Sequence, residues 1–165
     1  MSQAPRVAVE PLSQREEAFL RAFARATFTV PRAFAADLQR QQGITTSEYY
    51  ALMHLSEAPG GSLRMSDLAV AGALSLSGMT RVVSRLEAHG WVRRERSSCD
   101  GRGWNAVLTD AGLRRLQEAW PTHLASVRRH VMDHLAGLDL DAVTEALQRF
   151  AIDVADDYQA PQPDR

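Results

Sequence analysis

Hydroxyl and arginine side chains recur at helical spacing between Leu76 and His89. Ser77, Arg81 and Ser84 fall at positions i, i+4 and i+7, so in a helix they share one face. Short hydroxyl side chains allow close approach to a ligand, and the planar guanidinium binds phosphate or the O6/N7 edge of guanine through two hydrogen bonds. This face therefore has the chemistry to enter the major groove of DNA. The residues expected to face the groove or its phosphates are Ser75, Ser77, Gly78, Thr80, Arg81, Ser84 and Arg85.

The opposite side of the same segment is apolar, which predicts an amphipathic helix seated on a core. Upstream, Ser66 is expected to cap a short helix, and residues 72–75 are expected to turn the chain into the second helix. This order of elements predicts a helix-turn-helix. The apolar positions of its second helix are Met79, Val82, Val83 and Leu86.

A two-stranded ribbon is expected after this helix. Gly90 is expected to stop the helix, and short apolar runs at 91–92 and 106–108 flank a polar tip that contains Gly101 and Gly103. Such a ribbon would form a wing beside the helix-turn-helix. Its candidate DNA-binding residues are Arg94, Arg96, Asp100 and Arg102, whereas a solvated strand face is the alternative interpretation of Arg93, Arg94 and Arg96.

In combination, these elements resemble the MarR family of bacterial transcriptional regulators. Their order and spacing are specific together, and the likeness extends over roughly residues 13–157. The chain departs from the family pattern by a glycine after Arg102, by Trp91 in place of a smaller aliphatic residue, and by Pro31 in the first helix. The matching motifs are Leu68-Ala69, Ser75-Leu76-Ser77 through Thr80-Arg81, Leu86 through Gly90-Trp91-Val92-Arg93-Arg94, Asp100-Gly101-Arg102, and Leu108-Thr109-Asp110-Ala111-Gly112.

The resemblance implies a mainly α fold with a small β-wing: a winged helix-turn-helix plus N- and C-terminal dimerisation helices. It implies one domain over residues 1–165, with dimerisation helices at about 13–42 and 110–157 and a DNA-binding lobe at about 45–109. The implied function is a homodimeric repressor that binds a pseudo-palindromic operator and is released by a small-molecule effector. Arg81 is then the best candidate for base reading. Arg102 would reach an adjacent minor groove, and Asp100 would hold Arg102 or another wing arginine by an ion pair.

Helix signals flank this lobe. Ser13 with Glu16, and Thr45 with Glu48, form capping-box patterns, while Pro31 is expected to kink or interrupt the first helix. Gly43 should end that helix and residues 59–61 the next one. A long helix from Thr109, with apolar residues as far as Leu135 and a possible bend site at Pro121, should follow. A last helix is expected from about Asp139 to Tyr158. The apolar stripes exceed what the winged unit can cover, which predicts packing across a two-fold axis; a monomer core is the alternative.

Charge is distributed unevenly along the chain. The 165 residues carry a net charge of −1, but residues 60–115 hold nine arginines against five carboxylates, a net of +4. The remainder holds ten arginines against fifteen carboxylates, a net of −5. A positive middle segment favours DNA binding that weakens as salt rises. No apolar run is long enough to span a membrane, the N-terminus lacks a signal-peptide pattern, and Cys99 is the single cysteine, so we expect a cytoplasmic protein.

An effector site and a metal site are separate possibilities. The resemblance implies a small aromatic or anionic ligand between the dimer helices and the winged unit, although core packing is the alternative role of each candidate. No cofactor is expected. A zinc-responsive regulator is the alternative function, because His123, His130 and His134 would share one helix face. The candidate effector-binding residues are Tyr49, Tyr50, His54, Trp120 and His123.

Other classes of function have weaker support. Cys99 lies near Arg96 and Arg102, which could activate its thiol, but an exposed loop position is the simpler interpretation. The sequence has no phosphate-binding glycine loop and no nucleophile elbow, so an enzyme is not expected. A winged helix that binds protein rather than DNA is a further alternative, and retention on heparin would distinguish the two.

Overall fold

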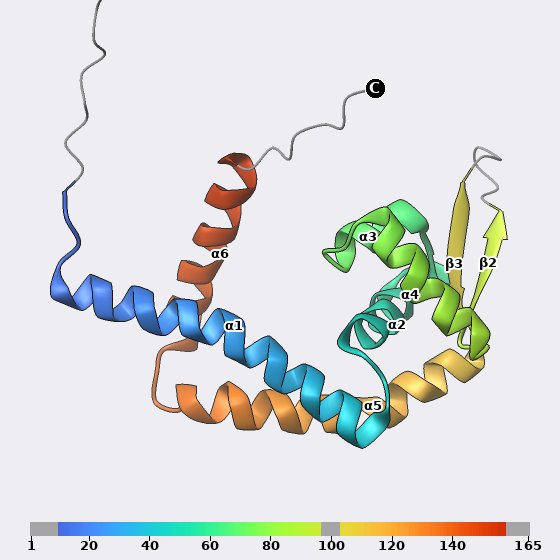
Figure 1. Cartoon of the computed structure of the whole chain (residues 1–165), viewed down its shortest axis with the longest axis horizontal. Helices are drawn as coiled ribbons and strands as arrows, with labels where there is room; N and C mark the ends of the chain where they lie inside the picture. Colours follow the sequence, from blue (N-terminus) through green and yellow to red (C-terminus); the bar gives the residue numbers. More distant parts are fainter. Residues whose placement is uncertain (1–9, 97–102, 158–165) are drawn as a thin grey trace, which may run out of the picture. The chain divides into compact units, whose positions relative to one another are not determined.

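The computed structural model describes residues 10–96 and 103–157, and it divides into two compact units at residues 127 and 128. The first unit holds α1 to α4, the strands and most of α5, and the second holds the end of α5 and the helices that follow (Figure 1). In chain order the elements are α1 (Gln14–Gln42), α2 (Thr46–Glu57), the 3-10 helix η1 (Pro59–Gly61), β1 (Ser62–Arg64), α3 (Met65–Ala71), α4 (Leu76–Ala88), β2 (Val92–Arg96), β3 (Trp104–Leu108), α5 (Asp110–His130), the 3-10 helix η2 (Met132–Leu135) and α6 (Leu140–Asp157). The predicted class, mainly α with a small β-wing, is confirmed.

Local capping signals set the ends of the first two helices. Both predicted capping boxes are present, with Ser13 and Glu16 at the start of α1 and Thr45 and Glu48 at the start of α2. In each box the carboxylate accepts a hydrogen bond from the N-cap backbone, which satisfies a group that the helix leaves unpaired. Gly43 ends α1 at a φ of 65°, a left-handed conformation that glycine adopts without a Cβ penalty.

The helix-turn-helix is formed by α3 and α4, joined by residues 72–75. The apolar face of α4 packs into the core, as the sequence predicts, and α2, α3 and β2 supply much of the opposing surface. Burial of these side chains fixes which face of α4 remains in solvent. The fully buried residues of this core include Leu38, Ile44, Tyr49, Leu52, Leu55, Leu68, Met79, Val83 and Leu86.

Three strands form an antiparallel sheet in the order β1-β3-β2. The predicted wing strands pair in the register Val92 with Leu108 and Arg96 with Trp104, so the wing is confirmed up to the start of its tip. The sequence did not predict β1, in which Leu63 pairs with Ala106. A segment of only three residues is too short to show the alternating pattern of a strand.

Two local predictions, a Ser66 cap and an interruption of the first helix at Pro31, are wrong. Ser66 does not cap α3: Arg64 occupies the N-cap position without a side-chain capping hydrogen bond, and the Ser66 hydroxyl lies 3.1 Å from a carboxylate oxygen of Asp67. Pro31 does not interrupt the first helix, because α1 continues through it as far as Gln42. A proline removes one backbone hydrogen bond, and the rest of a 29-residue helix keeps the chain helical on both sides.

The second unit consists of the last residues of α5, η2 and α6. The carboxylate of Asp139 accepts hydrogen bonds from the backbone nitrogens of Asp141 and Ala142, so the predicted start of the last helix is confirmed. Leu147 and Phe150 on α6 are exposed. Within residues 10–96 and 103–157, no helix combines the length and apolar character needed to cross a membrane.

Candidate nucleic-acid interface

The outer face of α4 presents the polar side chains that the sequence singled out. Ser75 caps this helix, since its hydroxyl oxygen accepts a hydrogen bond from the Gly78 nitrogen at 3.1 Å. A Cβ on Gly78 would lie 3.2 Å from that same oxygen, so glycine keeps the first turn compact. The predicted contact residues that are exposed are Ser75, Ser77, Thr80, Arg81, Ser84 and Arg85.

Two hydroxyl groups of this face are engaged within the helix. Thr80 Oγ1 donates to the Leu76 carbonyl at 2.8 Å, and Ser84 Oγ donates to the Thr80 carbonyl at 2.9 Å. Each hydroxyl hydrogen is therefore used inside α4, whereas the oxygens can still accept hydrogen bonds, of which Ser84 Oγ already accepts one from Arg94 at 2.8 Å. These residues are better suited to accepting than to donating a hydrogen bond in a groove.

Arg81 differs from its neighbours because its guanidinium has no hydrogen bond or ion pair with any residue that the structure describes. It is exposed and lies in the second turn of α4. Its five N–H donors are therefore free to form the planar, two-bond contact that guanine offers in the major groove.

Arg85 is held by an ion pair with Glu48 of α2, a helix that packs against α4. Its Nε donates to Glu48 Oε1 at 2.7 Å, and the other carboxylate oxygen of Glu48 accepts from Thr45 in the capping box. Burial raises the pKa of Glu48, but the hydrogen bonds from Arg85 and Thr45 outweigh it, and the pKa lies below its usual value. One ionised carboxylate thus fixes both the start of α2 and the position of Arg85.

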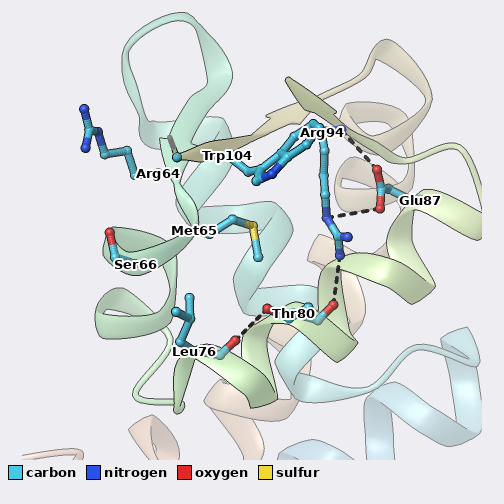
Figure 2. Close-up of a pocket in the computed structure, with 9 residues that line it drawn as sticks. Arg64, Met65, Ser66, Leu76, Thr80, Glu87, Arg94 and Trp104 are labelled. Atoms are coloured by element: carbon cyan, nitrogen blue, oxygen red, sulfur yellow. Dashed lines mark hydrogen bonds and ion pairs between the residues drawn. The ribbon is translucent and has the colours of Figure 1, made fainter. Parts of the chain in front are cut away.

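Arg94 on β2 connects the wing to α4 (Figure 2). Its NH2 donates to the Thr80 carbonyl at 3.0 Å and to Ser84 Oγ at 2.8 Å, and its Nε lies 3.2 Å from a carboxylate oxygen of Glu87. The Glu87 carboxylate also accepts from the Arg94 backbone nitrogen at 3.1 Å. The backbone nitrogen, Nε and NH2 of Arg94 are thus all engaged within the winged lobe, an arrangement that holds the wing in position against α4.

The base of the wing carries an arginine beside an aromatic ring. The Arg96 guanidinium lies 5.7 Å from the centre of the Trp104 ring on the paired strand, a cation–π contact. Arg93 is paired with Glu95 of its own strand at 2.7 Å, which matches the solvated strand face considered above. The proposed tip contacts, Asp100 and Arg102, and the thiol of Cys99 lie outside the described residues.

An open pocket of about 740 Å³ lies between α4, the start of α3 and the wing (Figure 2). Met65, Leu76 and Trp104 give it apolar walls, while Thr80 and Arg94 contribute polar atoms. The pocket adjoins the exposed face of α4. The polar and apolar surface available to a ligand is therefore continuous from this helix to the base of the wing.

Four of the five candidate effector residues gather in one aromatic cluster formed by α1, α2 and α5. The His123 ring centre lies 4.6 Å from that of Tyr49, 5.8 Å from that of Tyr50 and 6.4 Å from that of Trp120. Phe34 of α1 packs edge-on against His123 as well. The fifth candidate, His54, makes none of the ring contacts found among the described residues.

Burial sets the protonation of this cluster. It lowers the pKa of His123 and, with smaller repulsion from Tyr50 and Glu57, raises the pKa of Tyr49 to about 12. Both side chains are therefore neutral near pH 7. Tyr49 Oη and His123 Nδ1 are buried atoms that lack a hydrogen-bond partner among the described residues. Such atoms are costly unless something else satisfies them.

The geometry assumed for a zinc-binding helix face is wrong. α5 ends at His130, Val131 has a non-helical backbone at φ −132° and ψ −67°, and His134 lies in η2. The three histidines therefore do not share one continuous helix. No group of three or more histidine, cysteine, aspartate or glutamate side chains suited to a metal is present among residues 10–96 and 103–157.

The sequence did not reveal the second roles of Glu48 and Glu87, because their arginine partners depend on tertiary packing. Leu76 was also overlooked. It is an exposed apolar side chain that lines the pocket beside α4. No signal in the sequence marked it, because Leu76 lies three residues before Met79 and seven before Val83 and so continues the apolar stripe of the helix.

Comparisons with known proteins agree with this architecture. A family model described as MarR family matches residues 42–103. The transcriptional repressor MprA of Escherichia coli (strain K12) is 33% identical over 82 residues, which are 50% of this chain and 47% of that protein. The putative transcriptional regulatory protein for the hcr operon of Thauera aromatica is 33% identical over 85 residues, 52% of this chain and 50% of that protein. The chain thus spans about half the length of the curated relatives it matches.

Two solved structures match over most of the chain. AbsC, a MarR family transcriptional regulator from Streptomyces coelicolor, is 37% identical with a TM-score of 0.81, covering 89% of this chain and 99% of that chain. A second MarR family regulator from Streptomyces coelicolor, solved in complex with DNA, is 34% identical with a TM-score of 0.78, covering 85% of this chain and 91% of that chain. Identity at this level over nearly the whole fold shows that the chain belongs to the MarR family of transcriptional regulators.

Proposed function

We propose that this MarR-family chain is a homodimeric, sequence-specific DNA-binding repressor rather than an enzyme. The observation that carries the proposal is the outer face of α4, where Arg81, which has no partner among the described residues, lies beside hydroxyl oxygens on a helix whose opposite face is fixed in the core. In a winged helix-turn-helix, this face enters the major groove. The relative solved in complex with DNA supports the same use of the fold here.

The residues we assign to DNA contact fall into two groups. Arg81 reads a base edge, whereas Ser75 and Ser77 at the start of α4 and Arg85 in its last turn contact phosphates. Arg96, beside Trp104 on the wing, adds a third cation. Since Arg94 is engaged with Glu87, Thr80 and Ser84, its contribution to DNA binding is indirect.

Apolar residues outside the winged lobe support the homodimer. On α1, Phe19, Leu20 and Phe28 are 59%, 51% and 66% exposed, and on α6 Leu147 and Phe150 are also exposed. A two-fold partner would bury such surfaces and would set two recognition helices about one turn of DNA apart. We therefore propose a pseudo-palindromic operator, and repression by occlusion of a promoter.

Selection of bound duplexes from random DNA tests the proposal directly. The expected product is an inverted repeat whose half-sites lie about 10 base pairs apart. Sedimentation of the complex should give two chains per duplex, and affinity should fall steeply between 50 and 200 mM salt, as it does for about 6–10 phosphate contacts. Failure to enrich any sequence, or a stoichiometry of one chain with a single half-site, would contradict the proposal.

The aromatic cluster around His123 supports an effector site. A small aromatic compound with one polar group would stack on Tyr50 or Trp120 and satisfy the unpartnered Tyr49 Oη or His123 Nδ1. A panel of aromatic acids and phenols, screened by thermal shift and then for release of the operator, tests this site. Tyr49→Phe keeps the ring but removes the hydroxyl. A compound that acts equally on wild type and on this variant does not bind where we propose.

A further inference from the structure

The first turn of α4 carries an apolar side chain that the core does not use. Leu76 is the first residue of the helix and is 55% exposed. It points into the pocket between α4 and the wing (Figure 2). The other large apolar side chains of the helix are Met79, Val82, Val83 and Leu86, and all four are buried. Although its spacing continues the apolar stripe of α4, Leu76 is thus not part of the core that holds the helix.

The polar groups around Leu76 are occupied within the helix. Ser75 Oγ accepts from the Gly78 nitrogen and lies 3.2 Å from Ser77 Oγ. Thr80, one turn further along, donates its hydroxyl hydrogen to the Leu76 carbonyl at 2.8 Å. Thr80 therefore has no hydroxyl hydrogen to offer a base, whereas Ser75 and Ser77 share one hydrogen bond and keep a donor for phosphate. The Leu76 side chain is the exposed apolar group at this end of the helix.

Resting on the proposed DNA-binding function, we propose that Leu76 is a specificity-determining residue that contacts the 5-methyl group of a thymine. The N-terminal residues of a recognition helix approach the base edges of the major groove, and the thymine methyl is the one apolar group displayed there. Cytosine lacks this methyl, so the leucine favours thymine over cytosine at one position of each half-site. Arg81 and Leu76 then read different base pairs through different chemistry.

Replacement of thymine by deoxyuracil isolates this contact, because it removes only the methyl group and keeps the base pair. Each thymine of the selected operator is replaced in turn, and the dissociation constant is measured for the wild-type dimer. We expect one position per half-site at which the loss is about fourfold, the effect of one apolar carbon group of about 0.8 kcal/mol. Replacing both symmetric thymines should weaken binding by about 15-fold.

Variants of Leu76 assign the effect to this residue. Leu76→Ala should bind thymine and deoxyuracil operators equally well, while Leu76→Met, which keeps an apolar contact, should retain most of the discrimination. Leu113→Ala, at another exposed leucine on α5, is the matched control and should respond to deoxyuracil as the wild type does. Because Leu76 is exposed, all four proteins should melt at similar temperatures, which shows that the fold is intact.

The outcomes separate this inference from the function on which it rests. Tight operator binding with no response to any deoxyuracil, or a response that persists unchanged in Leu76→Ala, would overturn the inference and leave the proposed function standing. If the wild-type chain bound no duplex at all, both would be overturned. A response that disappears only in the Leu76→Ala variant supports both.

Discussion

The main effect of replacing Arg94 by alanine should be a loss of folding stability rather than the loss of a contact with DNA. The guanidinium side chain is 26% exposed, donates to Thr80 and Ser84 of α4, and lies 3.2 Å from the Glu87 carboxylate. A hydrogen bond from a charged group contributes about 1.5–3 kcal/mol, and partial exposure to solvent reduces this. We therefore expect a loss of about 2 kcal/mol in the free energy of unfolding. For a chain of this size, this corresponds to a fall in Tm of about 4–8 °C.

Denaturant unfolding and thermal melting at fixed protein concentration measure this loss. Arg93→Ala is the matched control, because Arg93 lies on the same strand and, among the described residues, pairs with the exposed Glu95 alone. Its loss in the free energy of unfolding should stay below about 0.5 kcal/mol. Operator affinity is compared at a temperature where every variant is folded. The reasoning is refuted if Arg94→Ala unfolds as the wild type does and yet loses as much operator affinity as Arg81→Ala.

Three further predictions test the fold with four substitutions. Burial lowers the pKa of His123, so the stability that its neutral form contributes is present above about pH 6.5 and is lost as the pH falls below that value. In urea unfolding, His123→Phe should therefore make the free energy of unfolding less dependent on pH between pH 7.5 and 5. An unchanged pH dependence would count against this cause. The pKa of Glu48 is lowered instead, so its contribution to stability should disappear as the pH falls below about 4.5. Glu48→Gln should have a lower free energy of unfolding than wild type at pH 7, and this free energy should decline less from pH 5 to 3. Gly112→Ala would place a Cβ 2.1 Å from the Trp91 carbonyl oxygen and should lower the free energy of unfolding by about 3 kcal/mol or more. Gly60→Ala, which meets open space but has a φ of +65°, should lower it by about 1 kcal/mol, and equal losses in denaturant titrations would exclude the clash.

Features that depend on neighbours in sequence were predictable. Both capping boxes join residues three positions apart, and the buried face of α4 follows from the spacing of Met79, Val83 and Leu86. The wing strands were predictable because each contains apolar residues from a short apolar run, and because glycines lie before β2 and between the two strands. These signals are local, so they survive without knowledge of the tertiary structure.

Contacts between distant segments were not predictable. The ion pair of Arg85 with Glu48 joins residues 37 positions apart. Arg85, which the sequence predicts as a phosphate contact, therefore also holds α2 against α4. The end of α5 at His130 has no glycine or proline to mark it, and the apolar residues Val131 and Leu135 continue the helical period beyond the break. The false zinc-binding face followed directly from that continued period.

The most direct test of the central claim, that the outer face of α4 reads paired bases, uses guanines that lack N7. Each guanine of the selected operator is replaced by 7-deazaguanine, and binding is measured for wild type and for Arg81→Ala. At one guanine per half-site, the wild type should lose affinity, while the variant, already weaker by about 1–3 kcal/mol, should lose no more. If both proteins respond equally at every guanine, or if Arg81→Ala binds the operator as tightly as wild type, Arg81 does not read the base and the claim fails.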